Sequence, residues 1–310
     1  EWVLDEHEAI PVIDHAYKSG INTWDTADVY SFGQSEEIIG KALRQLHIPR
    51  ERVVILSKCY FGLKEPGQKF DISSLFTNDG ELVNRVGLSR KHIFDAVEAS
   101  VKRLGTYIDV LQIHRLDRAT PREEIMRALN DVIDKGWVRY IGASSMAAWE
   151  FQQLQNIADK HGWHKFISMQ NYYNLIYREE EREMIPYCQN AGIGLVPWSP
   201  MAGGVLARPW TERNTKREET DKLVKDLSRD RSLKSDEDIV NRVEELANQK
   251  KVSMAEISIA WHLSKGTNPV LGLSKIERID DAVAALKVEL SEDEIRYLEE
   301  PYLPKRVQGY

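Results

Sequence analysis

The chain has 310 residues, of which 42% are hydrophobic and 29% charged, so it is long enough to bury a substantial core. Its net charge of -7 argues against general nucleic-acid binding, because such binding depends on neutralising phosphates with Lys and Arg. Cys59 and Cys188 are the only cysteines, so no disulfide framework is expected. No apolar run approaches the roughly 20 residues of a membrane span, and no signal peptide opens the chain. We expect a soluble, cytoplasmic protein.

Short apolar strand patterns alternate with amphipathic helix patterns along the chain. The expected order is helix 6–20, strand 21–25, helix 36–46, strand 53–58, helix 89–104, strand 108–114, helix 121–135, strand 138–144, helix 147–161, strand 166–171, helix 179–191, strand 194–197, helices 236–250 and 253–264, strand 269–273, and helices 277–286 and 291–300. Two long irregular stretches remain, at 60–88 and 201–234. Strands separated by helices at this rhythm predict βα units around a parallel sheet.

The number of strands bears on the fold. The pattern yields seven strands, whereas a closed (β/α)₈ barrel needs eight, and the chain begins inside a helix. We therefore expect a single barrel domain over 1–310 whose first strand precedes residue 1. In a barrel the two irregular stretches would be long loops over its C-terminal face. A doubly wound open sheet is the alternative that periodicity alone leaves open.

Four polar side chains stand at or just beyond the carboxyl ends of three successive strand patterns. Asp25 ends the first and is followed by Tyr30, Lys58 ends the second, and His114 ends the third. A parallel barrel places its chemistry at these strand ends. Each residue alone is more often a solvated or packing residue, so the case depends on their joint position.

These four residue types suit the reduction of a carbonyl group, which needs a proton donor and a group that polarises the C=O bond. A phenol has a pKa of about 10, and a neighbouring ammonium group lowers it by stabilising the phenolate. Tyr30 would be the general acid and Lys58 the group that tunes it. Asp25 would pair with the buried lysine charge, and His114 would donate a hydrogen bond to the carbonyl oxygen.

Later segments suggest a dinucleotide site. Ser144 and Gln170 follow strands and could bind a carboxamide, and Trp198 offers a flat ring to a nicotinamide. Gly272 permits close backbone approach to a phosphate, and Ser274 precedes a helix N-terminus suited to an anion. Core packing for Trp198 and ordinary helix capping for Ser274 are the alternatives. No G-x-G-x-x-G follows an early strand, so a Rossmann domain is disfavoured.

Taken together, these residues resemble the aldo-keto reductases over residues 5 to 300. The match is carried by the segments 24–30, 56–58, 112–114, 141–144, 198–204 and 272–281, together with Gln170. Within the family the chain looks most like the branch of the fungal versiconal hemiacetal acetate reductases, the aryl-alcohol dehydrogenase-like proteins and the potassium-channel β-subunits. The resemblance implies a (β/α)₈ barrel, NADPH (NADP⁺) bound without a Rossmann fold, and reversible reduction of aldehydes or ketones.

The resemblance also implies which residues contact the cofactor. From the nicotinamide along the pyrophosphate and its covering loop to the adenosine end, they are Ser144, Ser145, Gln170, Trp198, Ser199, Pro200, Met201, Ala202, Gly203, Arg208, Arg217, Gly272, Ser274, Arg278 and Asp281. Ser145 stands where many members have Asn, and Trp198 stands where many have Tyr. Lys275 and Arg278 are cations beside the expected anion site, which favours NADPH over NADH.

The expected substrate is a small-molecule carbonyl compound. Tyr60, Phe61, Arg115 and Tyr172 are expected to flank the pocket, which suggests an aromatic or bulky compound, although core or rim packing would explain them equally well. One alternative is a metal-dependent barrel hydrolase that uses Asp25 and His114, but no clustered metal-ligand spacing supports it, and no metal is expected. The other is a cofactor-binding regulatory subunit that acts through partner contacts.

Overall fold

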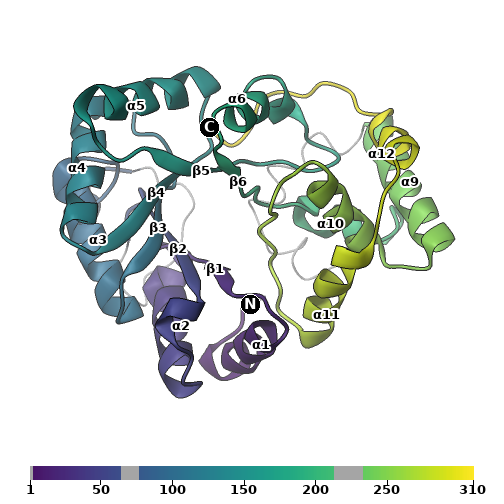
Figure 1. Cartoon of the computed structure of the whole chain (residues 1–310), viewed down its shortest axis with the longest axis horizontal. Coiled ribbons are helices and arrows are strands. Elements are labelled where there is room, and N and C mark those ends of the chain that lie inside the picture. The colour runs from purple at the N-terminus through teal and green to yellow at the C-terminus, as the bar shows by residue number, and fades with distance from the viewer. Residues whose placement is uncertain (1–2, 64–76, 213–232) are drawn as a thin grey trace. The chain divides into compact units, whose positions relative to one another are not determined.

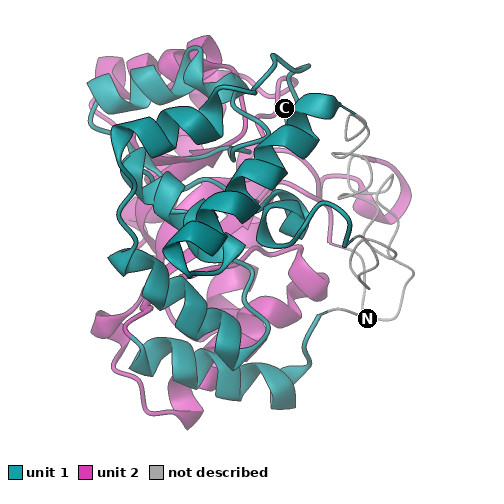
Figure 2. Ribbon diagram, turned by 90° about the vertical axis from the view of Figure 1, so that its right-hand side faces the viewer, with its two compact units in different colours: residues 1–19, 170–309 teal, residues 20–169, 310 magenta. Residues whose placement is uncertain are grey.

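The computed structural model describes residues 3–63, 77–212 and 233–310 (Figure 1). The chain divides into two compact units, which Figure 2 distinguishes by colour. We call residues 20–169, with residue 310, the tetrad unit, because they contain the four predicted catalytic residues. Residues 1–19 and 170–309 form the C-terminal unit. Each unit is described by itself, and the single domain over 1–310 stays a prediction, as does a strand ahead of residue 1.

The tetrad unit is built from βα repeats. Its strands are β1 (Thr23–Asp25), β2 (Val54–Cys59), β3 (Ile108–Ile113), β4 (Val138–Ser144) and β5 (Phe166–Gln170), the last residue of which belongs to the C-terminal unit. β1 to β5 lie beside one another in chain order, and the pairs from β1 to β4 are parallel. A doubly wound sheet would reverse its strand order at a switch point, so the unbroken order confirms the barrel type.

The intervening helices cover these strands on one side (Figure 1). They are α2 (Gln34–Gln45), α3 (Arg90–Leu104), α4 (Arg122–Asp134) and α5 (Ala148–His161), and each packs on the next. The Ser89 hydroxyl caps α3 by accepting from the His92 amide, and Gly105 ends that helix with a φ of 68°. Both signals agree with the predicted element at 89–104.

Most side chains of β2, β3, β4 and β5 are buried. In β2 every side chain after Val54 is buried, and Ile108 and Ile113 of β3 have no exposed surface. Apolar runs without clean alternation are typical of such strands. This burial removes the Lys58 side chain from water, so its charge needs partners within the protein.

The C-terminal unit is mainly helical. Its elements are α1 (Glu6–Lys18), the 3₁₀ turn η5 (Glu179–Glu181), α6 (Met184–Asn190), β6 (Gly194–Leu195), η6 (Ala202–Ala207), α9 (Lys234–Lys250), α10 (Met254–Ser264), α11 (Ile276–Ala284), η7 (Ala285–Lys287) and α12 (Glu292–Glu299). Six strands therefore alternate with helices over the described residues, which confirms the predicted α/β barrel class. Among the described helices none is long and apolar enough to cross a membrane.

The predicted strand at 269–273 is wrong as a regular element. The chain there makes two strand-like bonds, from the Asn268 amide to the Leu195 carbonyl and from the Val270 amide to the Pro197 carbonyl, each 2.9 Å long. Beyond them the segment is irregular, and Leu271 packs against an apolar cluster that includes Ile259 of α10. In this segment, packing against α10 therefore takes the place of the strand pairing that the apolar run suggested.

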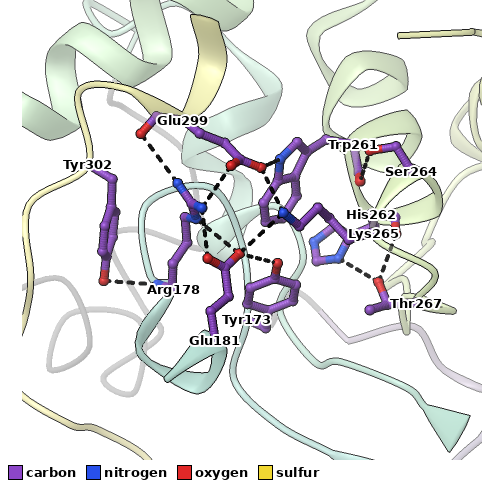
Figure 3. Close-up of polar contacts among 10 residues, drawn as sticks. All are labelled: Tyr173, Arg178, Glu181, Trp261, His262, Ser264, Lys265, Thr267, Glu299 and Tyr302. Atoms are coloured by element: carbon purple, nitrogen blue, oxygen red, sulfur yellow. Dashed lines mark hydrogen bonds and ion pairs between the residues drawn. The ribbon is translucent and has the colours of Figure 1, made fainter. Parts of the chain in front are cut away.

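A network of charged and aromatic side chains fixes the chain after β5 in the C-terminal unit (Figure 3). Arg178 bridges Glu181 and Glu299, at 2.7 and 2.8 Å, and the Tyr173 hydroxyl donates to Glu181 at 2.5 Å. The Trp261 indole donates to the same Glu299 at 2.8 Å. The charges are paired and hydrogen-bonded, as half-buried ions must be, so α10 and α12 hold this loop in one arrangement.

Of the two predicted long loops, 60–88 includes a described turn, η4 (Gly80–Leu82), and 201–234 includes η6 and the start of α9. Residues 64–76 and 213–232 of these loops lie outside the described residues. Their predicted position over the barrel's C-terminal face stays a prediction.

Candidate active site

The fold brings the four predicted catalytic side chains together within the tetrad unit. Asp25 is the last residue of β1, Lys58 lies opposite Gln112 in the parallel pair of β2 and β3, and His114 follows β3 directly. The ammonium Nζ of Lys58 donates to Asp25 Oδ2 at 2.5 Å and to the Tyr30 hydroxyl at 3.3 Å. The Tyr30 and His114 rings meet edge to face, with centroids 5.8 Å apart.

Lys58 is the centre of this arrangement. Its side chain is 0% exposed, and Nζ makes a third hydrogen bond, to the Thr26 carbonyl at 2.9 Å. Burial alone lowers the pKa of Lys58, but the charge and hydrogen bond of Asp25 and the contact with Tyr30 raise it by more, so the pKa is raised overall. The lysine is therefore a protonated ammonium in contact with the phenol.

Gln112 contacts the second oxygen of the Asp25 carboxylate. Its Nε2 donates to Asp25 Oδ1 at 3.1 Å, and its side chain is fully buried. We did not predict Gln112 or the Thr26 carbonyl as site residues. The signal for Gln112 is available in the sequence, because residues two apart on a strand face the same side and Gln112 stands two before His114.

His114 is a neutral imidazole in this environment. Burial, and after it the positive charges of Lys58 and Arg115, hold the pKa of His114 well below its usual range. Its Nδ1 is buried and has no hydrogen-bond partner among the described residues. A neutral ring has one N–H donor, and it can present that donor to an oxygen without bringing a second charge beside Lys58.

Tyr30 is the member of the four that reaches the surface, with 39% of its side chain exposed. It opens a tight turn, η1 (Tyr30–Gly33), in which Ser31, Phe32 and Gly33 all have left-handed backbones with φ of 49°, 56° and 88°. Non-glycine residues rarely adopt this conformation, and such strain is concentrated at functional sites. The turn presents the phenol while Lys58 stays buried behind it.

An aromatic wall continues from His114. The Phe61 ring lies 4.8 Å from the His114 ring and 5.1 Å from the Tyr60 ring, in edge-to-face contacts. Arg115 donates from Nη1 to the His114 carbonyl at 2.6 Å and lies 6.0 Å from the Phe61 ring centroid. Three of the four predicted substrate residues are thus grouped beside the predicted catalytic residues.

The predicted nicotinamide residues are divided between the two units. In the tetrad unit Ser144 and Ser145 are buried at the end of β4, with their hydroxyl oxygens 3.5 Å apart. In the C-terminal unit Gln170 ends β5, and Trp198 stacks on Tyr172 with ring centroids 4.6 Å apart. Tyr172, the fourth predicted substrate residue, is buried between the rings of Trp198 and Tyr177.

The predicted pyrophosphate segment forms a compact turn in the C-terminal unit. Ser199 has a left-handed backbone, with a φ of 55°, and its hydroxyl accepts from the Gly203 amide at 3.1 Å. Ala202 and Gly203 are left-handed as well, and Pro200 and Met201 stand between them and Ser199. A Cβ added at Gly204 would lie 2.6 Å from Arg208 Nη2, so the guanidinium lies directly on this turn. A guanidinium beside a tight left-handed turn suits a phosphate anion, so these residues fit that part of a dinucleotide.

The predicted adenosine end lies at the start of α11. A Cβ added at Gly272 would meet no described atom within 4 Å, so the backbone is open to close approach. The residue before the helix is Lys275, and no side chain caps it, so Ser274 is not the cap. Arg278 instead reaches back to the Ser274 hydroxyl at 3.5 Å. A helix N-terminus with two exposed cations suits an anion.

Asp281 and Arg217 are the two remaining predicted cofactor residues. Asp281 lies in α11, where burial and, after it, neighbouring carboxylates including Glu256 raise its pKa. Arg217 lies outside the described residues. The described ranges hold no group of three or more His, Cys, Asp or Glu side chains that could bind a metal ion.

Comparison with known proteins agrees with this geometry. The sequence model of the Aldo/keto reductase family matches residues 1–302. The chain is 63% identical to the versiconal hemiacetal acetate reductase of Aspergillus parasiticus, over 99% of this chain and 90% of that protein. It is 56% identical to a Schizosaccharomyces pombe protein named "Putative aryl-alcohol dehydrogenase", over 100% and 89% of the two chains. It is 49% identical to an aldo-keto reductase of Fusarium vanettenii, over 100% and 85%. The chain therefore belongs to the aldo/keto reductase family of NAD(P)H-dependent oxidoreductases.

Proposed function

We propose that this enzyme reduces an aldehyde or ketone with NADPH, and that Tyr30 is the general acid. The observation that carries the proposal is the position of Lys58, whose buried ammonium donates both to Asp25 and to the Tyr30 hydroxyl. An ammonium at that distance stabilises the phenolate that remains after Tyr30 gives up its proton.

Each of the four residues has a distinct role in the proposed reaction. Tyr30 donates its proton to the carbonyl oxygen, and Lys58 stabilises the resulting phenolate. Asp25 keeps Lys58 protonated although its side chain is shielded from water. The neutral His114 donates a hydrogen bond that orients and polarises the carbonyl group. When bound, the dinucleotide supplies the hydride.

The preference for NADPH over NADH is supported by the charge at the start of α11. Lys275 and Arg278 are both exposed there, beside a helix N-terminus that no side chain caps. A 2′-phosphate would gain charge-assisted hydrogen bonds from these cations, whereas the hydroxyl of NADH would not.

For the substrate we propose an aromatic carbonyl compound that carries an anionic or strongly hydrogen-bond-accepting group. Tyr60 and Phe61 supply ring faces and edges beside His114. Burial lowers the pKa of Arg115, and the phenols of Tyr30 and Tyr60 act in the opposite direction. A half-buried guanidinium in that setting favours a substrate that brings the acceptor with it. A relative whose printed name refers to aryl alcohols agrees with the aromatic part.

The test is Tyr30→Phe, assayed by NADPH oxidation with a panel of aromatic aldehydes and ketones. Turnover should fall by about 10²-fold or more, because the general acid is lost while the ring and its packing remain. Tyr140→Phe is the matched control, since Tyr140 is 56% exposed on β4 and lies away from the four residues. Near-parental turnover of Tyr30→Phe in a chemistry-limited assay would refute the assignment.

No observation favours the alternative of a regulatory subunit that acts through partner contacts. The four residues of a reductase site are assembled, which a protein acting only by contact does not need. We also propose the cytoplasm as the compartment, because both cysteines, Cys59 and Cys188, are free and buried.

A further inference from the structure

The turn that carries Tyr30 is not stable by local preference. Ser31 and Phe32 are left-handed, and side chains with a Cβ avoid that conformation unless the surroundings impose it. The distance between the Tyr30 hydroxyl and Lys58 Nζ depends on this turn. Something beyond the turn must therefore hold it against β2.

Glu36 makes the contacts that can do so. It lies in the first turn of α2, three residues after the left-handed turn, and its side chain is 0% exposed. Its Oε1 accepts from the Ser57 hydroxyl at 2.5 Å, and its Oε2 accepts from Arg103 Nε at 2.7 Å. Ser57 directly precedes Lys58 on β2, and Arg103 is near the end of α3. One carboxylate thus joins the Tyr30 turn to the strand that carries Lys58.

Close packing supports the same junction from the other side. Gly33 and Gly40 are spaced three before and four after Glu36, so all three lie on one face of the turn and helix. A Cβ at Gly33 would lie 2.7 Å from Arg103 Cδ, and one at Gly40 would lie 2.4 Å from the Leu104 carbonyl oxygen. The end of α3 is therefore in direct contact with the helix that follows Tyr30.

A second buried carboxyl group lies in the loop before Tyr30. The Asp28 amide donates to the Lys58 carbonyl at 3.2 Å, and its Oδ1 has no hydrogen-bond partner among the described residues. Burial and the charge of Glu36 raise the pKa of Asp28 well above its usual range. Burial thus disfavours a negative charge on Asp28, and the carboxylate that contacts Arg103 is that of Glu36.

We propose that Glu36 is a positioning residue for carbonyl reduction, which through Ser57 and Arg103 sets the Tyr30 hydroxyl at its distance from Lys58. Glu36 touches neither substrate nor cofactor in this role. The inference rests on the proposed function of Tyr30 as general acid, and the experiment separates the two.

The experiment compares Glu36→Gln with Glu37→Gln, the same change at an exposed neighbour on the same helix. Glu36→Gln should lower kcat by about 10- to 100-fold, as expected when a catalytic group is misplaced by about an ångström. The KM for NADPH should stay within about twofold of the parent, because the residue lies outside the cofactor segments. The pH profile of kcat should change, since the distance from Lys58 to the phenol changes. Glu37→Gln should behave like the parent.

A double-mutant cycle with Tyr30→Phe distinguishes positioning from general support of the fold. Once the phenol is gone its position no longer matters, so Glu36→Gln should lower the residual rate by less than about twofold. An equal loss in both backgrounds, with an unchanged pH profile, would overturn the inference. Parental kcat in Glu36→Gln beside an inactive Tyr30→Phe would also overturn it and leave the proposed function intact. An active Tyr30→Phe would overturn the proposed function and the inference with it.

If Glu36→Gln does not fold, Ser57→Ala tests the same link by removing only the contact with β2. Its kcat should fall by about threefold or more at an unchanged KM, with the circular dichroism spectrum of the parent. An unchanged kcat would overturn the inference.

Discussion

Asp25→Asn tests the ion pair on which the site is built. The substitution keeps the shape of the side chain and an oxygen that can accept from Lys58, but it removes the charge. The pair is buried, with 0% of the Lys58 side chain and 11% of the Asp25 side chain exposed, and the two charged atoms are 2.5 Å apart. The variant therefore leaves a buried lysine charge without its counter-charge.

The magnitude can be bracketed from the structure. Breaking a buried pair by removing one partner costs about 3–5 kcal/mol. Besides the asparagine oxygen, two acceptors remain for Lys58, the Thr26 carbonyl at 2.9 Å and the Tyr30 hydroxyl at 3.3 Å, which favours the lower figure. The lysine can also lose its proton, and at pH 7 that limits the cost to about 5 kcal/mol for an ordinary lysine pKa of about 10.4. We expect the free energy of unfolding to fall by about 3 kcal/mol at pH 7.

The pH dependence has a definite sign. In the parent the pKa of Lys58 is raised by folding, so its contribution is fully present below about pH 10.4 and is lost as the pH rises through the folded value. In Asp25→Asn the folded pKa should fall below the unfolded one, and the unfolded chain then binds more protons. Stability of the variant should rise with pH over that window, so its deficit should be smaller at pH 9.5 than at pH 7.

The measurement is urea unfolding followed by circular dichroism at both pH values, with Asp95→Asn as the matched control. Asp95 pairs with Lys91 on the surface of α3, with 60% and 65% of their side chains exposed, and should contribute less than about 1 kcal/mol. If Asp25→Asn loses no more stability than Asp95→Asn at pH 7, the ion pair of Asp25 and Lys58 is not buried and the reasoning is refuted. A deficit that does not change with pH would show that the loss has another origin.

The remaining predictions concern cofactor choice, packing, acid stability and substrate choice. Arg278→Ala should weaken NADPH more than NADH by about 10- to 100-fold in fluorescence titrations, and equal losses would contradict the proposed phosphate contact. Gly40→Ala should lower the unfolding free energy by about 1–3 kcal/mol, because its Cβ would lie 2.4 Å from the Leu104 carbonyl; unchanged urea unfolding would refute that close approach. Burial lowers the pKa of His262 to about 3, so stability should fall below about pH 6.5 by up to about 1.4 kcal/mol per pH unit, and His262→Gln should show a shallower acid loss. Arg115→Met should raise the KM for carboxylate-bearing aromatic carbonyls by about 10-fold relative to those without the group, and a uniform change would contradict its role.

Local sequence signals were sufficient for most elements of the tetrad unit. The strand expected at 138–144 is β4 with the same bounds, and Ser89 caps α3 as predicted. Asp25, Lys58 and His114 could be found because parallel neighbouring strands bring their carboxyl ends together. That rule requires only the order of the strands, and the alternation of strand and helix patterns in the sequence gives this order.

The rest of the site depends on contacts between residues far apart in the sequence. The link from Glu36 to Arg103 spans 67 residues, and no spacing rule connects the two. The expected strand at 269–273 was wrong because an apolar run fits a helix surface as well as a strand ladder. Ordinary capping by Ser274, the alternative to an anion site, does not occur, because the residue before α11 is Lys275 and the helix begins at Ile276, one residue before the predicted 277.

The Tyr30 turn shows why the four predicted catalytic residues could be found from the sequence, whereas the contacts that hold them could not. Left-handed backbones at Ser31 and Phe32 cost about 1–2 kcal/mol each, and a short peptide of this sequence would relax away from them. In the folded unit the buried contacts of Glu36 with Ser57 and Arg103 offset that cost. Tyr30 can therefore be recognised from its place after a strand, whereas the contacts proposed to set its distance from Lys58 come from α3 and β2. Substitutions at that junction should alter turnover while leaving all four catalytic residues in place.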